Sequence, residues 1–174
     1  PKSFNEKIQY LKLNDRSPLH TICADKVLVR NHIAKKIGYE FLIPIIGVAD
    51  NEDELIKLIH NQKNVIIKAN HNSGGSYIIK NSIINNDRKI NEIKHHFKKL
   101  LKKNYYYDGK EWQYKNINPR IIIEELLQDD KGNIPTDFKF FCFNGKALYI
   151  QLDIDRFDNH KRNIYDLNWE LQPF

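Results

Sequence analysis

An Asn-Gly pair between two runs of strand-forming residues constrains the fold of this chain more than any other feature. Asn144-Gly145 separates Phe138–Phe143 from Lys146–Asp155, and this dipeptide favours the two-residue turn that joins antiparallel strands. We therefore expect a β-hairpin that turns at Asn144-Gly145. Side chains alternate between the two faces of a strand. Because aromatic residues of Phe138–Phe143 fall on both faces, we expect both faces to be covered.

Helical patterns dominate the first third of the chain. Ser3 and Glu6 form a capping box, which predicts a helix to about Leu13. A second helix is expected over Ala24–Ile37, since the glycine that follows suits the left-handed position beyond a helix end. Acidic residues at 50–54 predict the start of a third helix, because the helix dipole favours negative charge there.

Strand patterns dominate the remainder. Three apolar runs predict strands: Val65–Lys68, Tyr77–Lys80 and Ile121–Leu127. Lys89–Lys103 has the apolar stripe of a basic amphipathic helix. We therefore expect an α+β fold, in which N-terminal helices precede a mostly antiparallel sheet with an inserted basic helix. The change from helical to strand patterns divides the chain into a helical region, residues 1–62, and a sheet region, residues 63–174.

The composition excludes several classes of protein. The chain has 174 residues, of which 41% are hydrophobic and 29% charged, and this is the balance of a globular protein rather than a disordered chain. No apolar run approaches the roughly 20 residues of a membrane-spanning helix. Cys23 and Cys142 lie far apart without CxxC spacing, which argues against a zinc or redox site and favours a reducing cytoplasm.

The net charge of +6 attracts polyanions such as nucleic acid, anionic membrane surfaces or nucleotide phosphates. The alternative is that lysine is simply the default surface residue of this chain. A nucleic-acid-binding module could use the basic helix together with the aromatic residues Tyr105, Tyr106, Tyr107, Trp112 and Tyr114, since aromatic rings stack on bases. We prefer a solvated lysine face and a packed tyrosine cluster, and do not expect nucleic acid as a partner.

A glycine loop between two predicted strands is the first candidate for chemistry. Gly74-Gly75 lies in a run of small and polar residues, where backbone N–H groups can approach phosphate oxygens closely. Lys68 ends the preceding strand and can place a positive charge on phosphate. The loop is neither a Walker A motif nor a Rossmann fingerprint, because GxxxxGK[ST] is absent and a strand follows. An ordinary glycine hairpin with an exposed lysine is the alternative.

The end of the strand Ile121–Leu127 is the second candidate. Its apolar run finishes in two acids and two leucines, which can offer backbone groups to an adenine edge and an apolar surface to the adenine ring. The alternative is a strand that meets water, with the two acids as its solvated end.

These segments and others, taken in order and spacing, resemble a known family. The matching pieces are Phe4–Ile8, Ala24–Lys26 with Val29-Arg30, Ile43-Pro44 with Gly47-Val48, Ile67-Lys68 with Asn70-His71 and Ser73-Gly74, Glu111-Trp112, Ile123–Glu125, Asp137–Phe143 with Gly145, Asp155-Arg156, His160 with Arg162, and Tyr165-Asp166. Residues 25–163 resemble the nucleotide-binding part of the ATP-grasp superfamily. Nearly the whole chain resembles the TupA-like ATP-grasp family of bacterial surface-polysaccharide and teichuronopeptide biosynthesis.

The resemblance implies an ATP-binding site. Lys26 is similar to a lysine that reaches a nucleotide phosphate from a helix, and Lys68 to a strand lysine that contacts phosphate and adenine. The flexible loop over the phosphates would consist of Asn72, Ser73, Gly74, Gly75 and Ser76. The hinge that holds the adenine amino group would consist of Glu124, Glu125, Leu126 and Leu127.

The resemblance also implies roles for residues near the C-terminus. Asp137 stands where the superfamily has a ribose-binding acid, so Asp replaces the more usual Glu, and Lys139 is grouped with the ATP-binding residues. Arg156 and Arg162 would act as catalytic residues that stabilise the transferred phosphate or an acyl-phosphate, as guanidinium groups do well. For Arg162, an ordinary surface arginine in a loop is the alternative.

Magnesium ligands are expected outside this sequence. ATP-grasp enzymes hold Mg²⁺ with an Asp or Glu and a Glu-x-Asn-type pair on two late strands, and no such strands precede Phe174. The resemblance therefore places the ligands beyond residue 174, in a longer protein, unless the chain is an inactive relative. Asp153 and Asp155 share one face of a strand, but they precede the expected position, and we expect them to be surface or lid residues.

The implied function is that of the ATP-binding part of a carboxylate–amine ligase. It would activate a carboxylate as an acyl-phosphate and join it to an amine in cell-surface polysaccharide biosynthesis. Its partners would be a nucleotide and a sugar-polymer precursor or an amino acid, in the cytoplasm or at the inner face of the membrane. A glycosyltransferase-like protein using a nucleotide-sugar is the alternative, although no DxD motif is followed by the parallel-strand pattern of such enzymes.

Overall fold

The computed structural model describes the chain except residues 81, 83–85, 155–160 and 174. The chain forms two compact units, residues 1–126 and residues 127–174, and each has its own antiparallel sheet. The α+β class is thus confirmed. The division differs from the expected boundary after residue 62, because a strand before that boundary pairs with the centre of the first sheet. No helix in the described part of the chain is long and apolar enough to cross a membrane.

Helices open the first unit. They are α1 (Phe4–Asn14), α2 (Pro18–Ala24), α3 (Leu28–Ile37) and the 3-10 turn η1 (Tyr39–Phe41). The capping box expected at the start of α1 is confirmed. The Ser3 hydroxyl accepts from the Glu6 N–H, and the Glu6 carboxylate accepts from the Ser3 N–H.

The expected helix Ala24–Ile37 is only partly correct, because α3 begins four residues later, at Leu28. Asp25 ends α2, and its Oδ1 accepts the backbone N–H of Val27 at 2.8 Å, so a turn separates α2 from α3. The sequence signal for α2 was Ser17 followed by proline, since serine caps a helix and proline suits its first turn. Lys26 therefore lies on the connection between two helices rather than on a helix.

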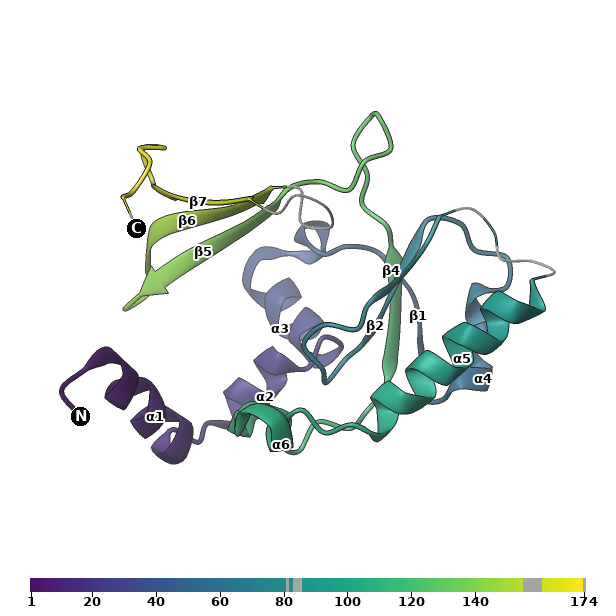
Figure 1. Cartoon of the computed structure of the whole chain (residues 1–174), viewed down its shortest axis with the longest axis horizontal. Coiled ribbons are helices and arrows are strands. Elements are labelled where there is room, and N and C mark those ends of the chain that lie inside the picture. The colour runs from purple at the N-terminus through teal and green to yellow at the C-terminus, as the bar shows by residue number, and fades with distance from the viewer. Residues whose placement is uncertain (81, 83–85, 155–160, 174) are drawn as a thin grey trace. The chain divides into compact units, whose positions relative to one another are not determined.

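A four-stranded sheet forms the centre of the first unit (Figure 1). Its strands are β1 (Ile45–Ala49), β2 (Val65–Ala69), β3 (Tyr77–Ile79) and β4 (Ile121–Glu125). They lie in the order β1-β4-β2-β3, and every neighbouring pair is antiparallel. The expected pairing of the two strands around the glycine loop is confirmed, because β2 pairs with β3. β4 occupies a central position, although it comes last in the chain.

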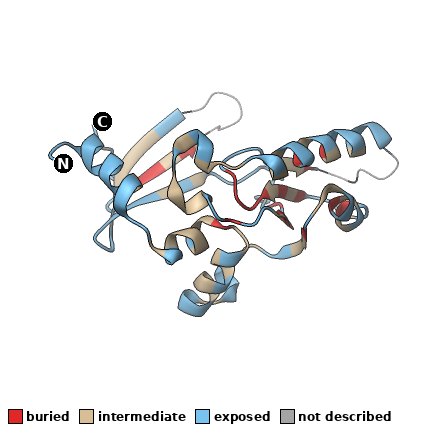
Figure 2. Cartoon of the chain, turned by 90° about the horizontal axis from the view of Figure 1, so that it is seen from below, coloured by how far each residue is buried: buried red, intermediate tan, exposed pale blue. Residues whose placement is uncertain are grey.

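The two faces of this sheet have different neighbours. Figure 1 shows α4 (Glu52–Ile59) and α5 (Asp87–Lys102) on one side, and α2 and α3 on the other. The side with α4 and α5 is the hydrophobic core, in which Leu55, Ile93 and Phe97 are fully buried against the strands. Figure 2 shows buried residues, in red, in these strands and along one side of the covering helices.

The opposite face of the sheet carries polar side chains. Lys68 on β2 lies directly across from Ile122 on β4, and Ile66 lies across from Glu124. Since side chains alternate along a strand and paired residues share a face, these four side chains point away from the core. Two short elements complete the unit: α6 (Tyr106–Gly109) and the 3-10 turn η2 (Trp112–Tyr114).

The second unit is an antiparallel sheet of three described strands. They are β5 (Asp137–Phe143), β6 (Lys146–Ile154) and β7 (Lys161–Asp166), in the order β5-β6-β7. β5 and β6 turn at Asn144-Gly145, and both turn residues have positive φ, 49° and 78°. The hairpin predicted from the sequence is therefore confirmed.

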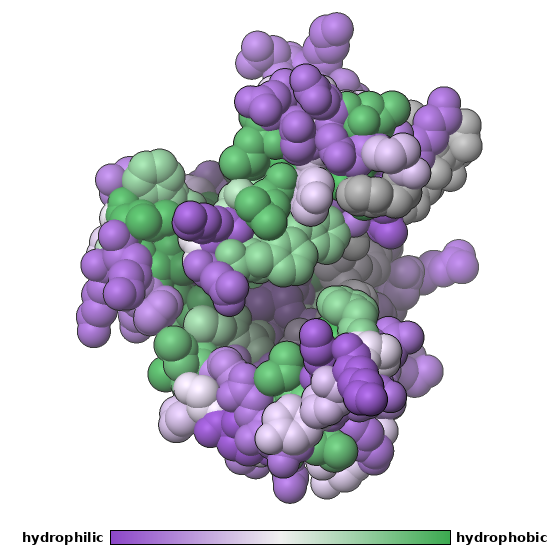
Figure 3. Space-filling view, turned by 90° about the vertical axis from the view of Figure 1, so that its left-hand side faces the viewer, coloured by the Kyte–Doolittle hydropathy of each residue, from purple (hydrophilic) through white to green (hydrophobic). Residues whose placement is uncertain are grey.

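The expected covering of β5 on both faces is not found among the described residues. Phe138, Phe140, Phe141 and Phe143 are between 40% and 59% exposed. A register shift after Phe141 also disturbs the alternation on which the expectation rested. Apolar side chains are visible on the surface of the molecule as green atoms in Figure 3. The aromatic residues of β5 thus belong to an open sheet surface and not to a closed core.

Replacing Phe97 by alanine should lower the free energy of unfolding by about 3–5 kcal/mol, because the ring is fully buried. Urea unfolding followed by circular dichroism measures this loss. Phe140→Ala is the matched control: its ring is largely exposed, so its effect should stay within about 0.5 kcal/mol. Equal losses in the two variants would contradict the location of the core.

Candidate functional site

Lys26 is anchored at the point where β2 ends and the glycine loop begins. Its ammonium donates to the carbonyl oxygens of Ala69, at 3.1 Å, and of Asn72, at 2.5 Å. Burial, and next the positive charge of Lys68, lower the pKa of Lys26 from its ordinary value. A lysine of this kind favours a nearby anion, because an anion would offset both effects.

Glu124 joins two cations on the polar face of the sheet. Its carboxylate accepts from Lys68 Nζ at 2.8 Å and from Arg30 at 2.8 Å. Arg30 also donates to the carbonyl oxygen of Ile43. The Glu124 side chain is 9% exposed, so Glu124, Arg30 and Lys68 form a largely buried triad. The triad has a net charge of one positive unit, and the nearby Lys26 adds a second.

Arg30 is a residue that the site prediction missed. It had been noted as part of a matching segment, without a role. It lies four residues after Lys26, but Lys26 precedes α3, so the spacing of a helix face does not account for their meeting. The partner, Glu124, lies 94 residues further along the chain and could not be identified from spacing.

The first part of the glycine loop, Asn70–Asn72, is buried and held by several hydrogen bonds. Asn70 Nδ2 donates to Asp25 Oδ1 at 3.0 Å, and Asn70 Oδ1 accepts the Arg120 N–H at 2.7 Å. His71 Nε2 lies 3.1 Å from the carbonyl oxygen of Leu100 at the end of α5, and burial lowers the pKa of His71. These contacts hold the loop entrance between the turn after α2 and the end of α5.

The second part of the loop, Ser73–Ser76, is exposed and not helical. Gly74 and Gly75 have φ values of 81° and 72°, which side chains with a Cβ rarely adopt. A Cβ on Gly74 would have open space around it, so it is the backbone conformation that requires glycine there. The carbonyl oxygen of Gly75 lies 2.7 Å from His96 Nε2 on α5.

The predicted adenine hinge, Glu124–Leu127, is only partly free to bind a ligand. The N–H of Glu125 donates to the Pro44 carbonyl at 3.1 Å, and the N–H of Leu126 donates to the Asn64 carbonyl at 2.7 Å. Leu126 is buried, whereas Glu125 and Leu127 are exposed. An adenine edge would therefore need a donor other than these two N–H groups, and the hinge role stays a prediction.

A second polar cluster lies within the other unit. Asp153 on β6 accepts from Lys139 at 2.6 Å and from Arg162 at 2.8 Å, and Asp137 also bonds to Lys139. The contacts with Asp137 and Asp153 raise the pKa of Lys139. Asp153 was expected at the surface, but its side chain is 3% exposed, because Lys139 and Arg162 cover it.

Each unit brings some of the predicted site residues together. The first unit brings together Lys26, Lys68 and Glu124 beside the loop, and the second unit brings together Asp137, Lys139 and Arg162 around Asp153. Arg156 and Asp155 lie outside the described residues.

Comparison of the sequence with known families identifies the family of this chain. The model of the TupA-like ATPgrasp family matches residues 6–174. The chain belongs to this family. Comparison with curated proteins and with solved structures gives no match. The fold is ATP-grasp-like, and ATP-grasp membership supports nucleotide binding by this chain.

Magnesium, which ATP-grasp proteins generally use, has no evident site in the described part of this family member. Among the described residues, no group of three or more His, Cys, Asp or Glu side chains is suited to a metal ion. That the ligands lie beyond Phe174 stays a prediction.

Glu124→Gln should lower the free energy of unfolding by about 2–3 kcal/mol. This is less than the loss of about 3–5 kcal/mol for a fully buried pair, because Arg30 and Lys68 keep some contact with water. Chemical denaturation measures the change. Glu125→Gln is the matched control, since the neighbouring carboxylate is exposed, and it should leave stability within about 0.5 kcal/mol of the wild type. If both variants were as stable as the wild type, the triad would have no structural role.

Proposed function

We propose that this chain is the ATP-binding part of an ATP-grasp-type ligase that activates a carboxylate as an acyl-phosphate and joins it to an amine in cell-surface polysaccharide biosynthesis. Membership of the TupA-like ATP-grasp family supports the general role. The observation that carries the proposal is the convergence of Lys26 and Lys68 beside an exposed glycine loop, with Glu124 between Lys68 and Arg30.

The electrostatics of this group suit a polyphosphate. Lys26, Arg30 and Lys68 carry three positive charges against the single charge of Glu124. Burial and the positive charge of Lys68 are the main causes of the lowered pKa of Lys26. An anion at this position would therefore reduce the electrostatic repulsion between the two cations. Backbone N–H groups of a glycine loop provide further contacts for phosphate oxygens.

The proposed reaction has two steps. A carboxylate oxygen attacks the γ-phosphorus of ATP, the bond from that phosphorus to the ADP oxygen breaks, and an acyl-phosphate forms. An amine nitrogen then attacks the acyl carbon, the carbon–oxygen bond to phosphate breaks, and the nitrogen loses a proton. Lys26 and Lys68 would hold the phosphates, because lysine ammonium groups place positive charge on phosphate oxygens.

The basic helix α5 supports this proposal over nucleic-acid binding. Lys94 bonds to Asp53 at 2.7 Å, and Lys98 bonds to Glu52 at 3.3 Å. These lysines link α5 to α4 and are already partnered. The Tyr105 and Tyr114 rings pack edge to face. Both observations favour the solvated lysine face and packed tyrosine cluster.

Lys68→Ala should weaken ATP binding by about 10- to 150-fold, because a charge-assisted contact worth about 1.5–3 kcal/mol is lost. The fold should persist, since Arg30 still neutralises Glu124. Calorimetric titration with ATP, with and without Mg²⁺, measures the affinity. Lys63→Ala removes an exposed lysine just before the same strand and should bind ATP as the wild type does. Unchanged affinity in Lys68→Ala, or no ATP binding by the wild type, would refute the proposal.

ATP binding should also be accompanied by proton uptake at alkaline pH. The pKa of Lys26 is lowered in the free protein, and a bound phosphate should raise it again. Affinity should therefore be highest below this lowered pKa and should fall as the pH rises through it. Calorimetry in buffers of different ionisation enthalpy measures the uptake. Lys26→Arg, which stays charged, should remove both the uptake and the alkaline loss of affinity; persistence of the uptake would assign it to another group.

A further inference from the structure

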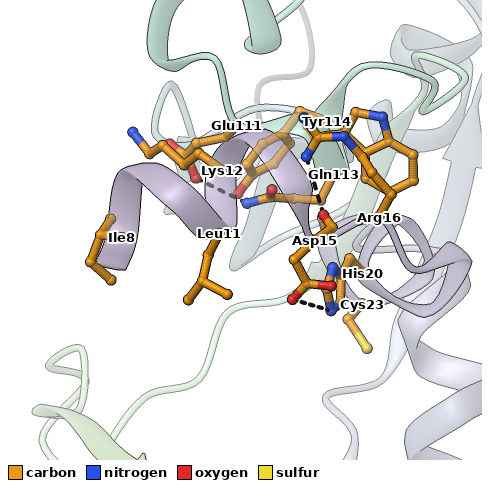
Figure 4. A pocket seen from close by; sticks show the side chains of 12 residues that line it. Ile8, Leu11, Lys12, Asp15, Arg16, His20, Cys23, Glu111, Gln113 and Tyr114 are labelled. Atoms are coloured by element: carbon orange, nitrogen blue, oxygen red, sulfur yellow. Dashed lines mark hydrogen bonds and ion pairs between the residues drawn. The ribbon is translucent and has the colours of Figure 1, made fainter. Parts of the chain in front are cut away.

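A cleft of about 490 Å³ lies within the first unit, apart from the triad around Glu124. Its walls come from α1, α2 and the segment of η2, as the close view in Figure 4 shows. α1 has no buried residue, and Lys12 ties it to the Gly109 carbonyl at 3.1 Å. The helix therefore serves as a wall of this cleft more than as a part of the core.

One wall of the cleft presents a positioned positive charge. The Arg16 guanidinium lies 5.3 Å from the centre of the Trp112 ring and donates to the backbone oxygen of Asp15. Within the described residues, Arg16 has no carboxylate at ion-pair distance. A guanidinium that is stacked on a ring and lacks a carboxylate partner is pre-oriented to bind a carboxylate with two hydrogen bonds.

Another wall presents a negative charge. Glu111 accepts from the side-chain amide of Gln113 at 3.0 Å, and the described residues place no cation within ion-pair distance of it. Arg16 and Glu111 reach the cleft from different elements, while Ile8 and Leu11 add apolar side chains from α1 (Figure 4). Lys12 and Asp15 also line the cleft, but Lys12 donates to the Gly109 carbonyl and Asp15 lies 3.8 Å from His20 Nε2. Arg16 and Glu111 are therefore the cation and the anion that we assign to a ligand, beside an apolar surface.

We propose that this cleft binds a free α-amino acid as a zwitterion. The ligand's carboxylate pairs with Arg16, its ammonium pairs with Glu111, and its side chain lies against Ile8 and Leu11. A molecule with a single charge would leave either Arg16 or Glu111 without an oppositely charged partner, which costs affinity. The volume of the cleft accommodates a ligand of this size.

This inference rests on the proposed function, in which the amino acid is the amine substrate. Ala24 lines the cleft, and Lys26 follows two residues later. Since consecutive Cα atoms are about 3.8 Å apart, the backbone of the cleft wall lies within about 8 Å of Lys26. The wall of the cleft formed by Ala24 therefore lies close along the chain to Lys26 of the proposed nucleotide site.

Tryptophan fluorescence tests the proposal directly. The chain has two tryptophans, so Trp169→Phe leaves Trp112 as the single tryptophan, whose emission is excited selectively over that of tyrosine. Glycine, L-alanine, L-serine, L-glutamate and L-lysine are titrated into this protein, with and without a non-hydrolysable ATP analogue. We expect at least one to give a saturable change in emission. Its N-acetyl and its carboxamide derivatives, which each lack one charge, should bind about 10-fold more weakly or worse.

Charge variants identify the residues. Arg16→Gln should lose the preference for the amino acid over its carboxamide, and Glu111→Gln should lose the preference over its N-acetyl derivative. These selective losses, measured by calorimetry, would not follow from a merely structural role. Arg88→Gln removes an exposed arginine of α5 and should change neither preference.

The outcomes separate this inference from the proposed function. If ATP binds but none of the amino acids does, with or without the ATP analogue, the cleft proposal is overturned and the nucleotide site stands. If an amino acid binds with the expected selectivity but ATP does not, the cleft stands as an amino-acid site and the ligase proposal fails. Equal binding of the amino acid and both derivatives would also overturn the cleft proposal.

Discussion

The carboxylate of Glu124 is the interaction on which the candidate nucleotide site depends. It lies on β4, one of the two central strands of the first sheet, and contacts Arg30 and Lys68, each at 2.8 Å. Without it, two cations and the nearby Lys26 would face one another in a half-buried position, where opposite charge is needed to hold like charges together. Glu124 neutralises one of these charges and leaves a net positive group, which is the balance that an anionic ligand requires.

The first sheet can carry this charged group because its two faces have different surroundings. One face is packed by α4 and α5 around Phe97 and its neighbours, which makes the strands rigid. The other face carries Lys68 and Glu124, and the turn between α2 and α3 brings Lys26 to it. Buried hydrogen bonds of Asn70 fix that turn to the loop entrance. The exposed glycines therefore extend from a firmly held base.

Sequence reasoning was accurate where the determining contacts are short in sequence. The capping box at Ser3, the β2–β3 pair and the turn at Asn144-Gly145 depend on neighbouring residues, and all three are confirmed. Sequence reasoning failed where contacts between distant parts of the chain determine whether a side chain is buried. Asp153 was expected to be a surface or lid residue, yet its side chain is 3% exposed and pairs with cations from two other strands.

The sequence by itself determined the family and the α+β class, and it pointed to the candidate lysines and the glycine loop. Only the tertiary structure decided which of these residues meet. Glu124 is 56 residues from Lys68 and 94 from Arg30. Their contact follows from the insertion of the late strand β4 between β1 and β2. Local propensity specifies a strand but not its neighbours, because strand order is set by the burial of whole faces, a property of the assembled chain.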